Sequence, residues 1–173
     1  MLIHELTEPE CQAVLKNVRI GRLACSHRDQ PYVVPIQAYL DGDCLYSFAT
    51  LGRKIEWMRV NPKVCVQFDD ITNRFQWTTI VVLGRFEELL NLPGDQAEAL
   101  RRRAHELFRR SPEWWQPASA SIAPRDDRMP VIYRIHIDEV TGRRTERPAH
   151  ETLRVPWWLD VVFESVETKN RDT

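Results

Sequence analysis

The 173-residue chain carries almost no net charge and has no long apolar run. Its 24 basic and 25 acidic residues leave a formal net charge of −1, which argues against a general binder of nucleic acid or of membrane surfaces. No segment is apolar over the length that a transmembrane helix needs. The opening MLIHELTEPE also lacks the basic and apolar regions of a signal peptide. We therefore predict a cytoplasmic protein with no membrane or nucleic-acid partner.

Cysteine and histidine are few, and neither has the spacing of a metal site. The four cysteines include no CxxC pair, and the five histidines include no HExxH or HxH pair. Cys25, Cys44 and Cys65 lie inside strand-like runs, which suits small buried side chains. Disulfides are not expected in a reducing cytosol. The sequence therefore predicts structural thiols and no metal site.

Short segments with alternating apolar residues make up most of the chain. Strands are predicted at 22–27, 32–40, 43–49, 63–69, 76–83 and 130–138. Helices are predicted at 7–17, 53–60 and 95–110, the first with Thr7 and Glu10 as a capping box. The Asp41-Gly42 step indicates a hairpin, and Pro35 marks an edge, a bulge or a break. Closely spaced strands with inserted helices favour an antiparallel barrel of the α+β class.

The segment from Thr50 to Lys54 has the chemistry of a phosphate site. Gly52 allows a tight turn, and Arg53 and Lys54 then open a helix, where cations oppose the helix dipole. An anion bound there would offset this penalty and would accept hydrogen bonds from the free N–H groups of the first turn. The Thr50 hydroxyl could contribute as well. The alternative is that both cations are simply solvated.

Other charged or aromatic clusters have a functional and a structural interpretation. Glu87-Glu88 could be an acid–base pair, but solvent-facing charges at a strand end are the expectation. Arg101-Arg102-Arg103 is expected to be a solvated helix face rather than a nucleic-acid patch. Of the pairs Trp114-Trp115 and Trp157-Trp158, one is expected in the core or in a subunit interface. The alternative is that Trp114 or Trp115 forms a wall of a substrate pocket.

Ordered landmarks identify a family. They are IGRLACS (20–26), PYVVPI (31–36), FATLGRKIEWMRVNPKVCVQFD (48–69), WTTIVVLGRFEEL (77–89) and IDEVTGR (137–143). In this order they resemble the FMN-binding split-barrel superfamily, which includes pyridoxamine 5′-phosphate oxidase, and more particularly its branch with the nitroimidazole-resistance proteins. The resemblance implies a six-stranded antiparallel split β-barrel with peripheral helices over residues 1–143. Residues 144–173 would be a C-terminal extension that packs on the barrel or on a partner.

The resemblance also implies a cofactor, FMN, and a set of residues that contact it. Backbone groups of one strand would follow the isoalloxazine ring, a second segment would flank and bind the ribityl phosphate, and a third strand would pack near the ring. These residues are Val34, Pro35 and Ile36, then Ala49, Thr50, Arg53 and Lys54, then Trp77 and Thr79. Thr79 stands where the oxidase branch carries a longer glutamine. Members of the family are homodimers with the flavin at the subunit interface, and we expect the same here.

The implied activity is that of a flavoprotein oxidoreductase. FMN would pass electrons from a reduced nicotinamide to a small-molecule substrate such as a nitro compound. No Arg-x-His pair follows residue 143, although the oxidase branch uses one to hold pyridoxal phosphate, so oxidation of vitamin B6 is not expected. The alternatives are a deazaflavin-dependent reductase on the same fold and a carrier or sensor of flavin or haem without turnover.

Overall fold

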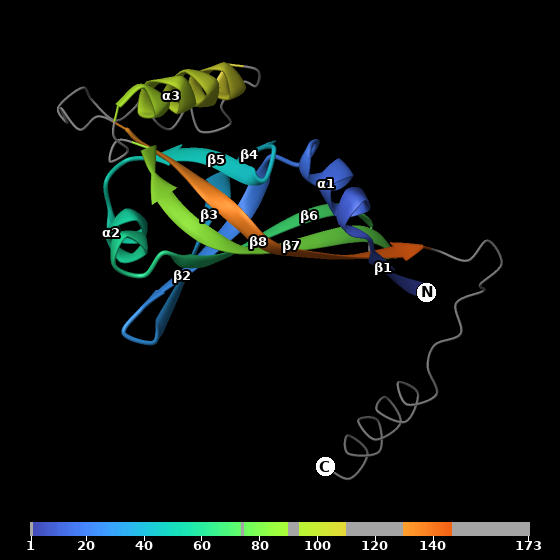
Figure 1. Cartoon of the computed structure of the whole chain (residues 1–173). Coiled ribbons are helices and arrows are strands. Elements are labelled where there is room, and N and C mark those ends of the chain that lie inside the picture. Colours follow the sequence, from blue (N-terminus) through green and yellow to red (C-terminus); the bar gives the residue numbers. More distant parts are fainter. Residues whose placement is uncertain (1, 74, 90–93, 110–129, 147–173) are drawn as a thin grey trace, which may run out of the picture.

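A computed structural model describes residues 2–73, 75–89, 94–109 and 130–146 (Figure 1). Both tryptophan pairs and nearly all of the predicted C-terminal extension lie outside these residues. The described residues form one antiparallel sheet and three helices. The strands are β1 Leu2–Leu6, β2 Ile20–His27, β3 Gln30–Gln37, β4 Tyr39–Asp41, β5 Cys44–Ala49, β6 Lys63–Asn73, β7 Gln76–Glu88 and β8 Val131–Glu146. The helices are α1 Glu8–Leu15, α2 Arg53–Val60 and α3 Gly94–Phe108.

The sheet has the order β3-β2-β6-β7-β8-β5-β4, and β1 pairs with β8. It curls so that its two ends approach each other, and the Ser47 hydroxyl of β5 donates to the Gln37 carbonyl of β3 at 2.7 Å. The predicted split barrel is therefore confirmed, with two short strands added to the six expected. One of them, β4, is separated from β3 at Ala38, whose N–H donates to the Arg19 carbonyl instead of continuing the strand.

Three strands continue beyond their predicted ends. β6 continues past residue 69 to Asn73, β7 past residue 83 to Glu88, and β8 past residue 138 to Glu146. The added part of β8 lies between β7 on one side and β1 on the other, where Leu6 pairs with Gly142. Pairing on both sides explains why a polar segment without a clear alternating pattern is a strand.

The inward side chains of the strands form the core, and two helices close its ends. The fully buried strand residues include Leu23, Val66, Phe68, Ile80, Val82, Tyr133 and Ile135. Helix α1 begins with the predicted capping box, in which the Thr7 N–H donates to the Glu10 carboxylate at 2.8 Å, and it buries Cys11 and Leu15. Helix α2 buries Ile55 and Met58 against the same core.

Helix α3 covers a different surface, the outer face of β4, β5 and the start of β8 (Figure 1). Its residues Ala104, Leu107 and Phe108 pack there in a second apolar cluster with Tyr39 and Tyr46. Arg103 also holds Asp41 with two hydrogen bonds of 2.6 and 2.9 Å. The outer face of β2, β3, β6 and β7 has no such cover from the described helices. None of the described helices is long and apolar enough to span a bilayer.

Candidate functional site

The first turn of α2 opens onto free space. β5 ends at Ala49, and the chain turns through Thr50 and Gly52 into α2, which begins at Arg53 as predicted. Gly52 is the N-cap residue in extended conformation, and no side chain caps the helix. A Cβ placed on Gly52 would meet no atom within 4 Å. The N–H groups of the first turn therefore have room for an external acceptor.

Two cations, Arg53 and Lys54, flank this opening. Among the described residues, neither Arg53 nor Lys54 forms an ion pair. Arg53 is exposed, whereas Lys54 is half-buried. Burial lowers the pKa of Lys54 below its ordinary value, because the ammonium loses water and gains no carboxylate. An anion at this position would compensate both the desolvated ammonium and the uncapped helix, so the residues present fit a phosphate group.

An aromatic cluster, which the sequence did not reveal, links Arg53 to β3. The guanidinium carbon lies 5.5 Å from the ring centre of Tyr32 on β3. The Tyr32 ring in turn lies 5.5 Å from that of Trp57 on α2, and Trp57 lies 5.7 Å from His27 at the end of β2. The cluster fixes α2 against the β2–β3 hairpin. His27, the last residue of β2, therefore has a packing role.

The strand β3 leads away from the start of α2 along the edge of the sheet. Ile36 is buried, Val34 is half-buried and Pro35 is exposed. Ile36 lies four residues beyond Tyr32, which corresponds to about 13 Å along a strand. In the described sheet β3 pairs with β2 only, so alternate backbone groups on its other edge remain available to a ligand. The predicted residues of β3, of the β5 end and of α2 therefore lie around one region of the chain.

Trp77 and Thr79 lie elsewhere. Thr79 pairs with Asp69, whereas α2 leads into Lys63 at the opposite end of β6, six residues and about 20 Å away. Figure 1 shows α2 and the start of β7 at opposite ends of the sheet. The Thr79 hydroxyl donates to the Asp69 carboxylate at 2.8 Å, and the Trp77 N–H donates to Thr145 at 3.1 Å. A single chain does not bring these two residues to the opening at α2.

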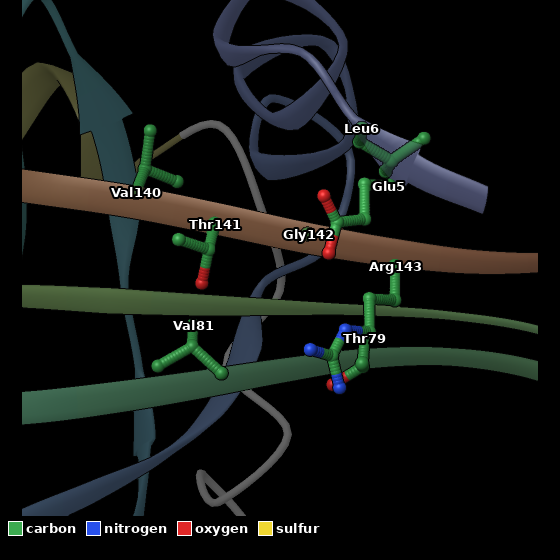
Figure 2. A pocket seen from close by; sticks show the side chains of 8 residues that line it. All are labelled: Glu5, Leu6, Thr79, Val81, Val140, Thr141, Gly142 and Arg143. Carbon is green, nitrogen blue, oxygen red and sulfur yellow. The ribbon is translucent and has the colours of Figure 1, made fainter. Parts of the chain in front are cut away.

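Thr79 instead lines an open depression of about 430 Å³ between β1, β7 and β8 (Figure 2). Arg143 lies beside Thr79 as its cross-strand neighbour, and Val81 and Thr141 form the next pair. The Arg143 guanidinium and the Glu5 carboxylate both line this depression, together with apolar side chains such as Leu6 and Val140. It is a second surface on which a ligand or another chain could rest.

The acidic residue Glu88, another candidate from the sequence, lies buried in the structure. It was expected to face solvent and instead holds Arg59 with two hydrogen bonds of 2.8 and 2.9 Å, so that expectation was wrong.

The four cysteines are free thiols, as predicted. Burial raises the pKa of each thiol, and that of Cys44 to about 12 with a further contribution from Asp43. The thiols are therefore protonated at neutral pH and are poor nucleophiles.

Comparison with known proteins agrees with this geometry. The family model described as pyridoxamine 5′-phosphate oxidase matches residues 7–144. An uncharacterized protein of Rhizobium meliloti (strain 1021) is 37% identical over 146 residues, which cover 83% of this chain and 95% of the relative.

Two solved structures extend the comparison. That of a FAD-binding protein from Mesorhizobium loti is 37% identical with a TM-score of 0.70, over 85% of this chain and 99% of the other. That of a 5-nitroimidazole antibiotic resistance protein from Bacteroides thetaiotaomicron shares the fold at 17% identity, with a TM-score of 0.56 over 85% and 93% of the two chains. With its ordered landmarks, split barrel and matching family model, the chain belongs to the pyridoxamine 5′-phosphate oxidase family.

Proposed function

We propose that this chain binds a flavin nucleotide, with the phosphate at the start of α2 and the ring along β3. The observation that carries the proposal is the half-buried ammonium of Lys54, which has no ion pair in the described part of the chain and stands at an uncapped helix start. The Arg53 guanidinium adds a second, forked donor whose position Tyr32 fixes. The relative from Mesorhizobium loti, described as FAD-binding, supports a flavin independently.

Arg53, Lys54 and the first turn of α2 are sufficient to bind FMN, which carries a single phosphate. One phosphate accounts for Arg53, Lys54 and the free N–H groups of α2, and none of these groups needs a second phosphate or an adenosine. FAD is the second candidate, favoured by the description of the Mesorhizobium loti relative. Its first phosphate could use the same residues. Release of the bound flavin by heat, followed by mass spectrometry, distinguishes the two.

The proposed activity is electron transfer from a reduced nicotinamide to a small acceptor such as a nitro compound. A bound flavin supplies the redox chemistry, and the protein supplies binding, orientation and exclusion of water. Rapid anaerobic bleaching of the flavin by NADPH, with recovery of colour on addition of a nitro compound, supports an oxidoreductase. A flavin that stays oxidised in NADPH contradicts it and favours a carrier or sensor.

We also propose a homodimer that contains the flavin at its interface. The register places Val33, Ala24, Cys65 and Leu83 side by side across the outer face of β3, β2, β6 and β7, which none of the described helices covers. Val33 is 57% exposed and Leu83 is 43% exposed, which is a large apolar surface to leave in water. Trp77 and Thr79 could then approach a flavin held by Arg53 and Lys54 of the other copy.

We place the protein in the cytoplasm. Its cysteines are all free thiols, which suits a reducing compartment. Fractionation of cells that express the tagged chain checks this location. Recovery in the periplasmic or secreted fraction would contradict it.

The phosphate assignment is tested with the double variant Arg53→Ala/Lys54→Ala. Two charge-assisted contacts are lost, so FMN affinity should fall by about a hundredfold or more. Riboflavin, which lacks the phosphate, should lose far less. The matched control, Lys16→Ala/Arg102→Ala, removes the same charge from exposed positions just after α1 and on α3. Equal losses for FMN and riboflavin would show the assignment to be wrong, and a protein that takes up neither FMN nor FAD would refute flavin binding.

A further inference from the structure

A second cluster of polar side chains lies on the outer face where β5 meets β8. Cys44 and His136 are direct cross-strand neighbours. Asp43 precedes Cys44 in the β4–β5 turn, and its carbonyl accepts a hydrogen bond from the Ile137 N–H at 2.9 Å. Cys44 begins β5, whereas Ala49 ends it beside α2. The cluster is therefore about 17 Å along the strand from the phosphate opening and is separate from it.

The three side chains converge at the spacing of metal ligands. The Cys44 Sγ lies 3.5 Å from the His136 Nδ1 and 3.4 Å from the Asp43 Oδ1, and the three ligand atoms lie within 4.8 Å of one another. A tetrahedral Zn²⁺ with Zn–S of about 2.3 Å and Zn–N or Zn–O of about 2.0–2.1 Å separates sulfur from the other ligand by about 3.5 Å. The distances from Cys44 Sγ to His136 Nδ1 and to Asp43 Oδ1 thus already match such a site. The exposed Asp43 carboxylate can rotate to adjust its distance to His136 Nδ1.

A carboxylate behind the imidazole orients it for coordination. The Glu87 Oε2 lies 2.9 Å from the His136 Nε2 and also accepts a hydrogen bond from the Arg134 Nε at 2.6 Å. With its Nε2 held against Glu87, the His136 ring turns its Nδ1 toward Cys44. This carboxylate–histidine arrangement is the common support of histidine ligands.

A cation in the centre of the cluster would contact all three ligand atoms at once. The donor set selects the cation, because thiolate with imidazole suits Zn²⁺, whereas Ca²⁺ and Mg²⁺ prefer oxygen ligands alone.

We propose that Asp43, Cys44 and His136 bind one Zn²⁺ ion through three protein ligands, with a fourth position open to solvent. Binding would displace the Cys44 thiol proton, which is released to solvent. The open side is that of the exposed Asp43 and of the His136 side chain, which is 30% exposed. The sequence predicted no metal site because Cys44 and His136 lie 92 residues apart and form no motif. Strand pairing brings them together.

The test is a titration of the purified full-length protein, after removal of metals by chelation, with Zn²⁺ by calorimetry and with Co²⁺ by difference spectroscopy. We expect one equivalent per chain, the visible bands of tetrahedral Co²⁺ and a thiolate-to-cobalt charge-transfer band. Asp43→Asn, Cys44→Ser and His136→Gln should each weaken binding by at least about tenfold, and Glu87→Gln by about ten- to a hundredfold. The matched controls Asp70→Asn, Cys65→Ser and His4→Gln should bind as the natural chain does.

The outcomes separate the alternatives. Failure of the natural chain to bind one equivalent, or binding without the charge-transfer band, would overturn the proposal. So would equal affinity of Asp43→Asn and Asp70→Asn. Should Cys44→Ser lose its fold by circular dichroism, the exposed Asp43 and the charge-transfer band of the natural chain still decide the question.

Discussion

Lys54 shows how a binding residue can weaken the fold that carries it. Its ammonium is half-buried without a carboxylate among the described residues, and burial lowers its pKa. We expect Lys54→Met to raise the free energy of unfolding of the flavin-free protein by about 0.5–1 kcal/mol and to weaken FMN binding. Urea denaturation and FMN titration measure the two effects, and Lys16→Met on the surface should change neither.

The difference in the free energy of unfolding between Lys54→Met and the natural chain should depend on pH, with a defined sign. Between the lowered pKa of folded Lys54 and the unfolded value of about 10.4, the unfolded chain binds more protons, so stability rises with pH. The gain in the free energy of unfolding of Lys54→Met is therefore complete below the pKa of Lys54 in the folded chain. It shrinks as the pH rises toward about 10.4. A constant advantage over this range would mean that the charge of Lys54 is not the cause.

A glycine is required at position 84 because the backbone of β8 passes very close to its Cα. A Cβ at this position would lie 2.2 Å from the His136 carbonyl oxygen and 2.8 Å from the Ile135 Cγ2, at the register shift between β7 and β8. A backbone oxygen cannot move aside as a flexible side chain can, so Gly84→Ala should lower the free energy of unfolding by about 2–4 kcal/mol. Gly52→Ala, with extended backbone and open space, should change it little. Equal denaturation midpoints would contradict this account.

At the scale of elements, Arg59 attaches the end of α2 to β7. Its partner Glu88 has a side chain only 5% exposed, so Arg59→Ala leaves a buried carboxylate unpaired. We expect a loss of about 2–3 kcal/mol, most of which Arg59→Met/Glu88→Leu should recover because no charge then stays buried. Arg85→Ala, which breaks an exposed pair with Asp138, should cost less than about 1 kcal/mol. Denaturant midpoints of the variants compare these losses.

Elements governed by local chemistry could be predicted from the sequence, and those governed by pairing could not. Helix α2 begins at residue 53 and ends at 60 as predicted, because Gly52 and Pro62 bound it locally. β1 and the end of β8 were missed because each depends on a partner strand rather than on its own pattern. The candidate site divides in the same way. Arg53 and Lys54 are adjacent in sequence, whereas Tyr32 reaches Arg53 only through the fold.

At the scale of the molecule, the outer surface of the barrel has two parts. Helix α3 covers the part formed by β4, β5 and the start of β8. The part formed by β2, β3, β6 and β7 exposes apolar side chains around the Arg22–Asp69 ion pair, whose atoms lie 2.7 Å apart. Such a mixed face, apolar with a fixed polar group, suits a subunit interface. It also lies between the opening at α2 and the distant Trp77 and Thr79.

Leu83 tests whether this face joins two copies and whether the flavin depends on the junction. Leu83→Arg places a charge at the β7 end of the apolar row, so we expect the dimer to dissociate in analytical ultracentrifugation. FMN affinity should then fall by about tenfold or more, although Leu83 lies on β7 and the phosphate residues on α2. Val60→Arg, at a position 68% exposed on α2, is the matched control and should remain dimeric. A Leu83→Arg protein that stays dimeric would exclude this face, and a monomer that binds FMN with full affinity would place the flavin within one chain.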